Sequence, residues 1–319
     1  MFYSIRHLTR FRYDSPVSES LMELRMHPRS EGSQRCFSFQ VSVDPRARVN
    51  EYRDYLGNNI HHFDVPGKHT QLRIVAEALV EVEAPPALPE RLGPEAWREL
   101  DELAATGDYW EMLMPSQFTQ STPALEELIA QLEIERGDDP LTFLRTLNAA
   151  VYSWFEYVPK ATRVDSPIDH AIETGQGVCQ DFAHIMTALV RHVRIPCRYV
   201  SGYLCPRQDH ADRSSEGATH AWVEALLPCG YGWVGFDPTN NLPAGDRHIR
   251  TAIGRDYADV PPTKGIFKGS AASELTVSVR VAPSDAPPPP EAELTLPEEW
   301  VAPPSDVVEA EQQQQQQQQ

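Results

Sequence analysis

A buried helix followed by three strands, within residues 175–241, is the feature that most constrains how this chain can fold. Apolar residues recur in this helix at spacings of three and four, which predicts a single buried face. They are Phe182, Ile185, Met186, Leu189, Val190 and Val193. The runs that follow, CRYVSGYL, HAWVEALL and YGWVGFDP, are rich in aromatic and β-branched residues and predict strands. The short turn PCGYG between the last two favours antiparallel pairing, and therefore an α+β core of helices packed on an antiparallel sheet.

The rest of the chain divides into segments of different composition. Residues 1–83 contain runs of period-two alternation, such as FYSIRHLTRFRY, and predict a β-rich N-terminal domain. Residues 84–115 open with APPALPERLGP and predict a Pro-rich linker and a helical segment. Residues 116–282 predict the core, in which Pro after Thr or Asp twice marks a helix start. Residues 283–319 are acidic and rich in Pro and Gln, without Lys or Arg, and predict a disordered tail.

Charge and hydropathy exclude several classes of protein. The net charge of -18 argues against a nucleic-acid partner, which would need a basic face, and against docking on an anionic membrane. The apolar runs are too short to span a bilayer, and the N-terminus lacks the apolar core of a signal peptide. We therefore expect a cytoplasmic protein that does not associate with membranes.

The cysteines and histidines give no clear metal or disulfide pattern. An odd number of scattered cysteines does not predict a disulfide framework. Cys205, His210 and Cys229 have spacings that fit no compact zinc motif. His61 and His62 point to opposite faces of a predicted strand and so make a poor metal pair. We expect no bound metal and no cofactor.

Cys179 lies at the predicted start of the buried helix. Backbone N–H groups are unpaired there, and the positive end of the helix dipole stabilises a thiolate. Gly175 and Gly177 allow a sharp turn and the approach of a substrate. The position alone equally suits a small buried residue, which is the usual fate of a free cysteine. The choice between a nucleophile and a core residue therefore depends on a base being nearby.

His220 and Asp237 are candidates for the base and for the group that orients it. His220 begins one predicted strand and Asp237 ends the next. In an antiparallel pair these two ends meet at the same edge of the sheet, so we expect the side chains to be neighbours. Taken alone, His220 suits a surface or capping position and Asp237 suits a turn that binds its own backbone. Together with Cys179 they form an ordered Cys–His–Asp set.

Three motifs of the chain carry a family resemblance. GQGVCQDFAHIMTALVRHVRIPCRYVSGYL, THAWVEALLP and GWVGFDPTNN resemble the catalytic core of the transglutaminase-like superfamily, whose members have a papain-like fold. YSIRHLTRFRYDSPVSES is similar to the β-rich N-terminal region of its bacterial members. The resemblance covers roughly residues 1–281 and implies that Cys179, His220 and Asp237 are the catalytic triad. It implies a cysteine enzyme that acts on amide or peptide bonds of a protein or peptide substrate through a thioester.

The donors that stabilise the oxyanion, and the acyl acceptor, stay open at this level. Candidate donors are the backbone N–H of Cys179 and the side chains of Gln176 and Trp154, although Trp154 better suits a core position. An amine acceptor gives transglutamination, and water gives deamidation or proteolysis. Acyl transfer from a thioester to an arylamine uses the same triad. A binding or scaffold module that retains the triad without catalysis is the alternative of a different class. The pattern does not decide the oligomeric state.

Overall fold

The computed structural model describes residues 1–207, 212–214 and 217–285. Met1–Asp285 form one compact unit. The predicted tail lies outside the described residues from residue 286 onward, and so does His210, which was considered above as a zinc ligand. Among the helices of the described part, none is long and apolar enough to cross a membrane.

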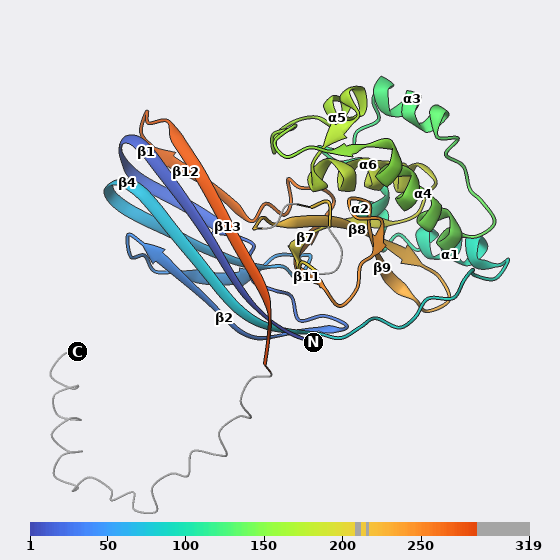
Figure 1. The fold of residues 1–319 in the computed structure, drawn as a ribbon, viewed down its shortest axis with the longest axis horizontal. Coiled ribbons are helices and arrows are strands. Elements are labelled where there is room, and N and C mark those ends of the chain that lie inside the picture. Colours follow the sequence, from blue (N-terminus) through green and yellow to red (C-terminus); the bar gives the residue numbers. More distant parts are fainter. Residues whose placement is uncertain (208–211, 215–216, 286–319) are drawn as a thin grey trace, which may run out of the picture. The chain divides into compact units, whose positions relative to one another are not determined.

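The sheet that contains the N-terminal strands, called the N-terminal sheet below, is antiparallel with the order β12-β1-β4-β2; β13 also pairs with β1, and β3 with β4. Figure 1 shows the long strands β1, β4 and β13 side by side. Alternating apolar residues of β1 and β4 supply the buried face, as the period-two pattern predicts. The strands are β1 (Phe2–Leu24), β2 (Gln34–Asp44), β3 (Asn50–Arg53), β4 (Asn59–Val82), β12 (Thr263–Lys268) and β13 (Ser273–Ser284).

Two strands of this sheet come from the end of the region that the sequence assigned to the core. β13 pairs with β1 from Phe2↔Ser284 to Tyr13↔Ser273, and β12 pairs with the second half of β1. The predicted boundaries of 116–282 therefore grouped residues 263–282 with the wrong sheet. Residue alternation identifies a strand but carries no information about its partner, because pairing is decided by contacts far apart in the sequence.

Six helices precede the core sheet. Thr122 Oγ1 accepts a hydrogen bond from the Leu125 N–H, and Asp139 accepts from the N–H groups of Leu141 and Thr142. Each cap is followed by a proline in the first turn, so both predicted helix starts are confirmed. The helices are α1 (Ala96–Ala105), α2 (Trp110–Leu113), α3 (Pro123–Gln131), α4 (Pro140–Trp154), α5 (Ile168–Thr174) and α6 (Cys179–His192).

The core sheet is antiparallel, with the order β10-β9-β8-β7-β11. Helix α6 packs on it, and Phe182 and Leu189 share one apolar cluster with Val223 of β8. Residues Gln180 to Arg191 of α6 are all buried, so this helix is covered on more than the one face that its apolar stripe predicted. The strands are β7 (Cys197–Leu204), β8 (His220–Leu227), β9 (Gly232–Asp237), β10 (Leu242–Pro243) and β11 (His248–Gly254). A short parallel pair, β5 (Glu156–Tyr157) and β6 (Gln176–Gly177), lies just ahead of α6.

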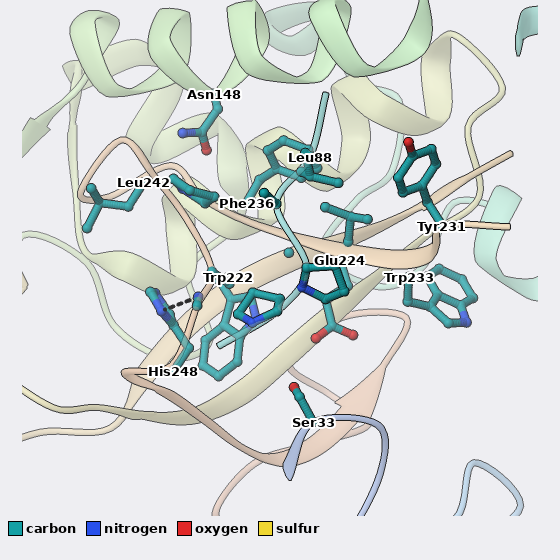
Figure 2. Close-up of a pocket in the computed structure, with 18 of the residues that line it drawn as sticks. Ser33, Leu88, Asn148, Trp222, Glu224, Tyr231, Trp233, Phe236, Leu242 and His248 are labelled. Atoms are coloured by element: carbon teal, nitrogen blue, oxygen red, sulfur yellow. Dashed lines mark hydrogen bonds between the residues drawn. The ribbon is translucent and has the colours of Figure 1, made fainter. Parts of the chain in front are cut away.

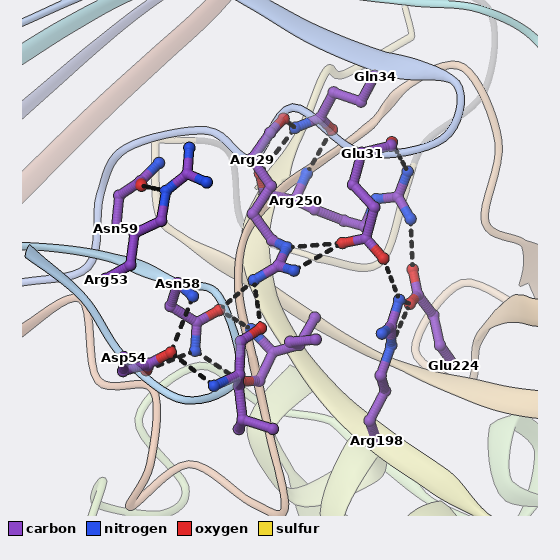
Figure 3. A network of polar contacts seen from close by, with 12 residues as sticks. Arg29, Glu31, Gln34, Arg53, Asp54, Asn58, Asn59, Arg198, Glu224 and Arg250 are labelled. Atoms are coloured by element: carbon purple, nitrogen blue, oxygen red, sulfur yellow. Dashed lines mark hydrogen bonds and ion pairs between the residues drawn. The ribbon is translucent and has the colours of Figure 1, made fainter.

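Polar contacts join the N-terminal sheet to the core sheet (Figure 3). Arg198 of β7 lies 2.7 Å from Glu224 of β8 and 3.5 Å from Glu31, which follows β1. Asn58, in the turn between β3 and β4, is fully buried and bonds both the N–H and the C=O of Ile253 at 2.9 Å. These contacts hold the N-terminal loops against the strands that carry the candidate site.

Candidate active site

Cys179 is the first residue of α6, as the sequence predicted. The β5–β6 pair and the hydrogen bond from the Val178 N–H to Asp181 Oδ2, 2.8 Å long, fix the chain that enters the helix. A side chain at Gly177 would place its Cβ 2.9 Å from the Cβ of Asp181, so this glycine is required by packing at the helix start. The thiol of Cys179 is half-buried, with Sγ 4.0 Å from the carbonyl oxygen of Thr219, which precedes His220.

The other four cysteines have environments that keep their thiols protonated. Burial raises the pKa of Cys36 and of Cys197 to about 11 and also raises the pKa of Cys205. Cys229 is exposed, and its pKa is raised by partial burial and by Glu99, to which the thiol donates a hydrogen bond. A thiol whose pKa is raised is a weak nucleophile at neutral pH.

His220 and Asp237 lie next to each other, as the hairpin topology predicted. β8 and β9 pair antiparallel from Leu227↔Gly232 to Val223↔Phe236, which brings the start of β8 to the end of β9. His220 Nε2 lies 2.8 Å from Asp237 Oδ2, and both side chains are almost fully buried. The orienting contact therefore forms within one local hairpin.

The Asp237 carboxylate also holds the turn that follows it. Oδ1 accepts hydrogen bonds from the backbone N–H groups of Thr239 and Asn240, at 3.0 and 3.2 Å, and Oδ2 accepts from the Asn240 side-chain amide at 2.8 Å. The sequence suggested either a turn or an orienting carboxylate, and the two oxygens serve both. Burial by itself would raise the pKa of the Asp237 carboxyl, but His220 and His248 hold it well below its usual range.

The ring of His220 is held by Asp237 on one side and faces the Cys179 thiol on the other. Burial by itself would lower the pKa of His220, but Asp237, through its charge and hydrogen bond, and Cys179 raise it to about 10. With Nε2 held by Asp237, Nδ1 is the nitrogen left for the thiol, and it has no hydrogen-bond partner among the described residues.

His248 is a further residue of this cluster that the sequence analysis did not identify. Its Nδ1 accepts a hydrogen bond from the Gly245 N–H at 3.1 Å, so the ring proton is on Nε2, which donates to Asp237 Oδ2 at 3.1 Å. Burial lowers the pKa of His248, which keeps the ring neutral at neutral pH. It lies on β11, and nothing in its sequence neighbourhood points to Asp237.

Gln176 and Trp154, the two side chains expected as oxyanion donors, have different surroundings in the structure. Gln176 donates its side-chain amide to Glu156 Oε2 at 3.1 Å in an exposed contact, so this N–H group already has a partner. Trp154 is 44% exposed, at the last residue of α4, and so does not take the core position that the sequence favoured. Phe155, one residue later, carries the apolar stripe into the core. The N–H of Cys179 lies in the first turn of α6, where backbone donors lack helical partners.

Comparisons with known proteins agree with this architecture. Residues 3–81 match the model of the bacterial transglutaminase-like N-terminal region, and residues 129–238 match that of the transglutaminase-like superfamily. The uncharacterized protein ML0607 of Mycobacterium leprae is 34% identical over 276 residues, which are 86% of this chain and 96% of the relative. The chain belongs to the transglutaminase-like superfamily.

Two further proteins that are similar to this transglutaminase-like protein have names that state an activity. A "putative cysteine protease" of Cytophaga hutchinsonii has a crystal structure with a TM-score of 0.69 and 22% identity, covering 90% of this chain and 93% of that one, and shares the fold. A protein-glutamine gamma-glutamyltransferase of Pseudomonas aeruginosa is 28% identical over 146 residues, which are 45% of this chain and 20% of the relative.

A cavity of about 930 Å³ in this transglutaminase-like fold lies beside the cluster (Figure 2). Trp222 and Glu224, which alternate with core-facing residues of β8, line it together with Trp233 and Phe236 of β9. The Trp222 ring also packs against His220 and His248, at centroid distances of 6.1 and 5.2 Å. The cavity thus reaches His248 from the side, whereas Cys179 is not among its lining residues.

The same cluster contains enough ligand atoms for a metal ion. His220, Asp237 and His248 each place one ligand atom within 4.8 Å of the others. The distances of 2.8 and 3.1 Å from the two rings to one oxygen of Asp237 are those of hydrogen bonds, and all three side chains are buried. The arrangement is therefore accounted for by proton positions without an ion.

Proposed function

We propose that this protein is a cysteine-dependent enzyme that cleaves amide bonds through a thioester on Cys179. The observation that carries the proposal is the hydrogen bond between His220 and Asp237, which leaves Nδ1 of His220 for the thiol of Cys179 at the start of α6. Membership of the transglutaminase-like superfamily supports the same assignment. We propose Cys179 as the nucleophile, His220 as the general acid and base, and Asp237 as the orienting carboxylate.

The reaction follows from these positions. The Cys179 thiolate attacks the amide carbonyl carbon, and the backbone N–H of Cys179 stabilises the negative oxygen that forms. The C–N bond then breaks as the His220 imidazolium gives its proton to the departing amine. In the second half, His220 takes a proton from an incoming nucleophile, which attacks the thioester carbonyl, and the C–S bond breaks. Asp237 stabilises the imidazolium in both halves.

The acyl acceptor is an amine or water, and the donor is an amide of a protein or peptide. The name of the Pseudomonas aeruginosa relative, a protein-glutamine gamma-glutamyltransferase, supports a glutamine side chain as donor and an amine as acceptor. The name of the Cytophaga hutchinsonii protein instead supports a peptide bond and water. Both outcomes pass through the same acyl-enzyme on Cys179.

Brief labelling with iodoacetamide at neutral pH, followed by peptide mapping, tests the nucleophile. We expect rapid modification of Cys179, which is lost in Cys179→Ala and retained in Cys229→Ala. Cys229 is the matched control because its thiol is more exposed than that of Cys179 while its pKa is raised. Faster labelling of Cys229 than of Cys179 in the native protein contradicts the proposal and favours a scaffold. Trapping of the acyl-enzyme from a lysate then identifies the donor by mass.

A further inference from the structure

Three side chains with metal-ligating atoms meet on the N-terminal sheet, outside the candidate active site. Glu51 of β3 and His61 of β4 are cross-strand partners in the sheet register, and His27 comes from the loop that follows β1. His27 Nδ1 lies 3.4 Å from Glu51 Oε1, and His61 Nε2 lies 3.7 Å from Glu51 Oε2. The ligand atoms of all three residues are within 4.8 Å of one another.

Hydrogen bonding does not account for this arrangement. Both contacts are longer than a good N–H···O bond, and His27 Nδ1 is buried without a hydrogen-bond partner among the described residues. His61 is only 8% exposed, so the burial of its polar ring is only weakly offset by hydrogen bonding. Ligand atoms bound tetrahedrally at about 2.0–2.2 Å from a metal are about 3.3–3.6 Å apart. The two contacts, which go to different oxygens of Glu51, are 3.4 and 3.7 Å long.

The chemical state of the two rings suits a metal. Burial lowers the pKa of His27, and the neighbouring His61 lowers it further. Burial also lowers the pKa of His61. Both imidazoles are therefore neutral at neutral pH, with lone pairs available. The Phe39 ring stacks on His27 at a centroid distance of 4.3 Å and lies 4.9 Å from the His61 ring, which restricts their rotation.

We propose that His27, Glu51 and His61 bind a divalent transition-metal ion, with Zn²⁺ as the preferred ion. Two imidazoles and one carboxylate are typical ligands of Zn²⁺, whereas Mg²⁺ and Ca²⁺ prefer sites made of oxygen atoms alone. Three protein ligands leave a fourth position to water. The half-exposed Glu51 carboxylate, 48% exposed, gives the ion a path from solvent.

The position of the site indicates a structural role. His27 lies two residues before Arg29, which donates a 2.7 Å hydrogen bond to Asn58 in the turn between β3 and β4 (Figure 3). The ion would join the same two segments, the loop after β1 and the β3–β4 hairpin, that contact the core through Asn58. All four residues of β3 are exposed, so a metal bond to Glu51 would add a buried anchor to an edge strand.

Titration of the full chain with Co²⁺ and Zn²⁺ tests the site. We expect one ion per chain, and loss of at least about tenfold in affinity in His61→Gln and in Glu51→Gln. His62→Gln is the matched control, since His62 lies next to His61 on the opposite face of β4, against the Tyr52 ring. It should bind as the wild type does, and so should Cys179→Ser, which removes the thiol of the candidate active site. Zn²⁺ should raise the melting temperature of the wild type, His62→Gln and Cys179→Ser, but not that of His61→Gln or Glu51→Gln.

Two results would overturn the proposal. One is the absence of stoichiometric binding to the wild-type chain. The other is binding that survives in Glu51→Gln and His61→Gln but is lost in Cys179→Ser, which would place the ion at the thiol. If His61→Gln does not fold, Glu51→Gln decides the question by itself, because the side chain of Glu51 lies on an exposed strand. The absorption spectrum of bound Co²⁺ gives an independent reading, because thiolate ligands add a charge-transfer band that nitrogen and oxygen ligands lack.

Discussion

Replacement of His248 by Phe removes one hydrogen-bond donor from the carboxylate that orients His220. The aromatic ring fills most of the same volume, while the 3.1 Å bond from Nε2 to Asp237 Oδ2 is lost. A hydrogen bond to a charged group contributes about 1.5–3 kcal/mol. If that amount is lost from the state in which His220 is an imidazolium, acylation slows by about 10- to 100-fold, since about 1.4 kcal/mol corresponds to a factor of ten.

The assay is the pre-steady-state acylation of Cys179 by p-nitrophenyl acetate, measured as a function of pH. The pKa of Asp237 is held low in part by His248, so losing that bond raises it, and the acid limb of the profile should move to higher pH. His248→Gln keeps an N–H donor and should recover part of the rate. A merely structural role would lower the melting temperature without moving the acid limb. Equal impairment of Phe and Gln variants with an unmoved acid limb would refute the positioning role.

Two further predictions follow from buried charges. The raised pKa of His220 stabilises the fold fully below its unfolded value of about 6.5, and this stability is lost as pH rises toward about 10. His220→Asn should therefore flatten the pH dependence of the free energy of unfolding above neutrality. The same variant should slow alkylation of Cys179 at about pH 6. An unchanged alkylation rate would argue against an ion pair between His220 and Cys179. Glu224→Gln leaves Arg198 and Arg250, 2.7 and 3.4 Å away, without their buried carboxylate and should cost about 3–5 kcal/mol in urea unfolding. The exposed pair Arg6–Glu77 is its control, and Glu77→Gln should cost less than about 1 kcal/mol.

Features set by local residue order could be predicted from the sequence. The helix start at Cys179 follows from a glycine-rich turn and an apolar stripe, and the caps at Thr122 and Asp139 follow from the residues next to them. The His220–Asp237 pair was predictable because one short turn joins β8 to β9, so the hairpin alone brings the two ends together.

Features that depend on distant pairing were decided only by the tertiary structure. β12 and β13 form strands, as the sequence predicts, but they pair with β1, which lies far earlier in the chain, because sheet partners are chosen by long-range burial. His248 reaches Asp237 only because β11 lies beside β7 in the same sheet. The same holds for His61. The alternation of side chains along its strand ruled out His62 as a second metal ligand, but the pairing of β3 with β4 and the loop after β1 place Glu51 and His27 next to it. The sequence by itself thus determined where Cys179, His220 and Asp237 lie, and the long-range strand order decided what surrounds them.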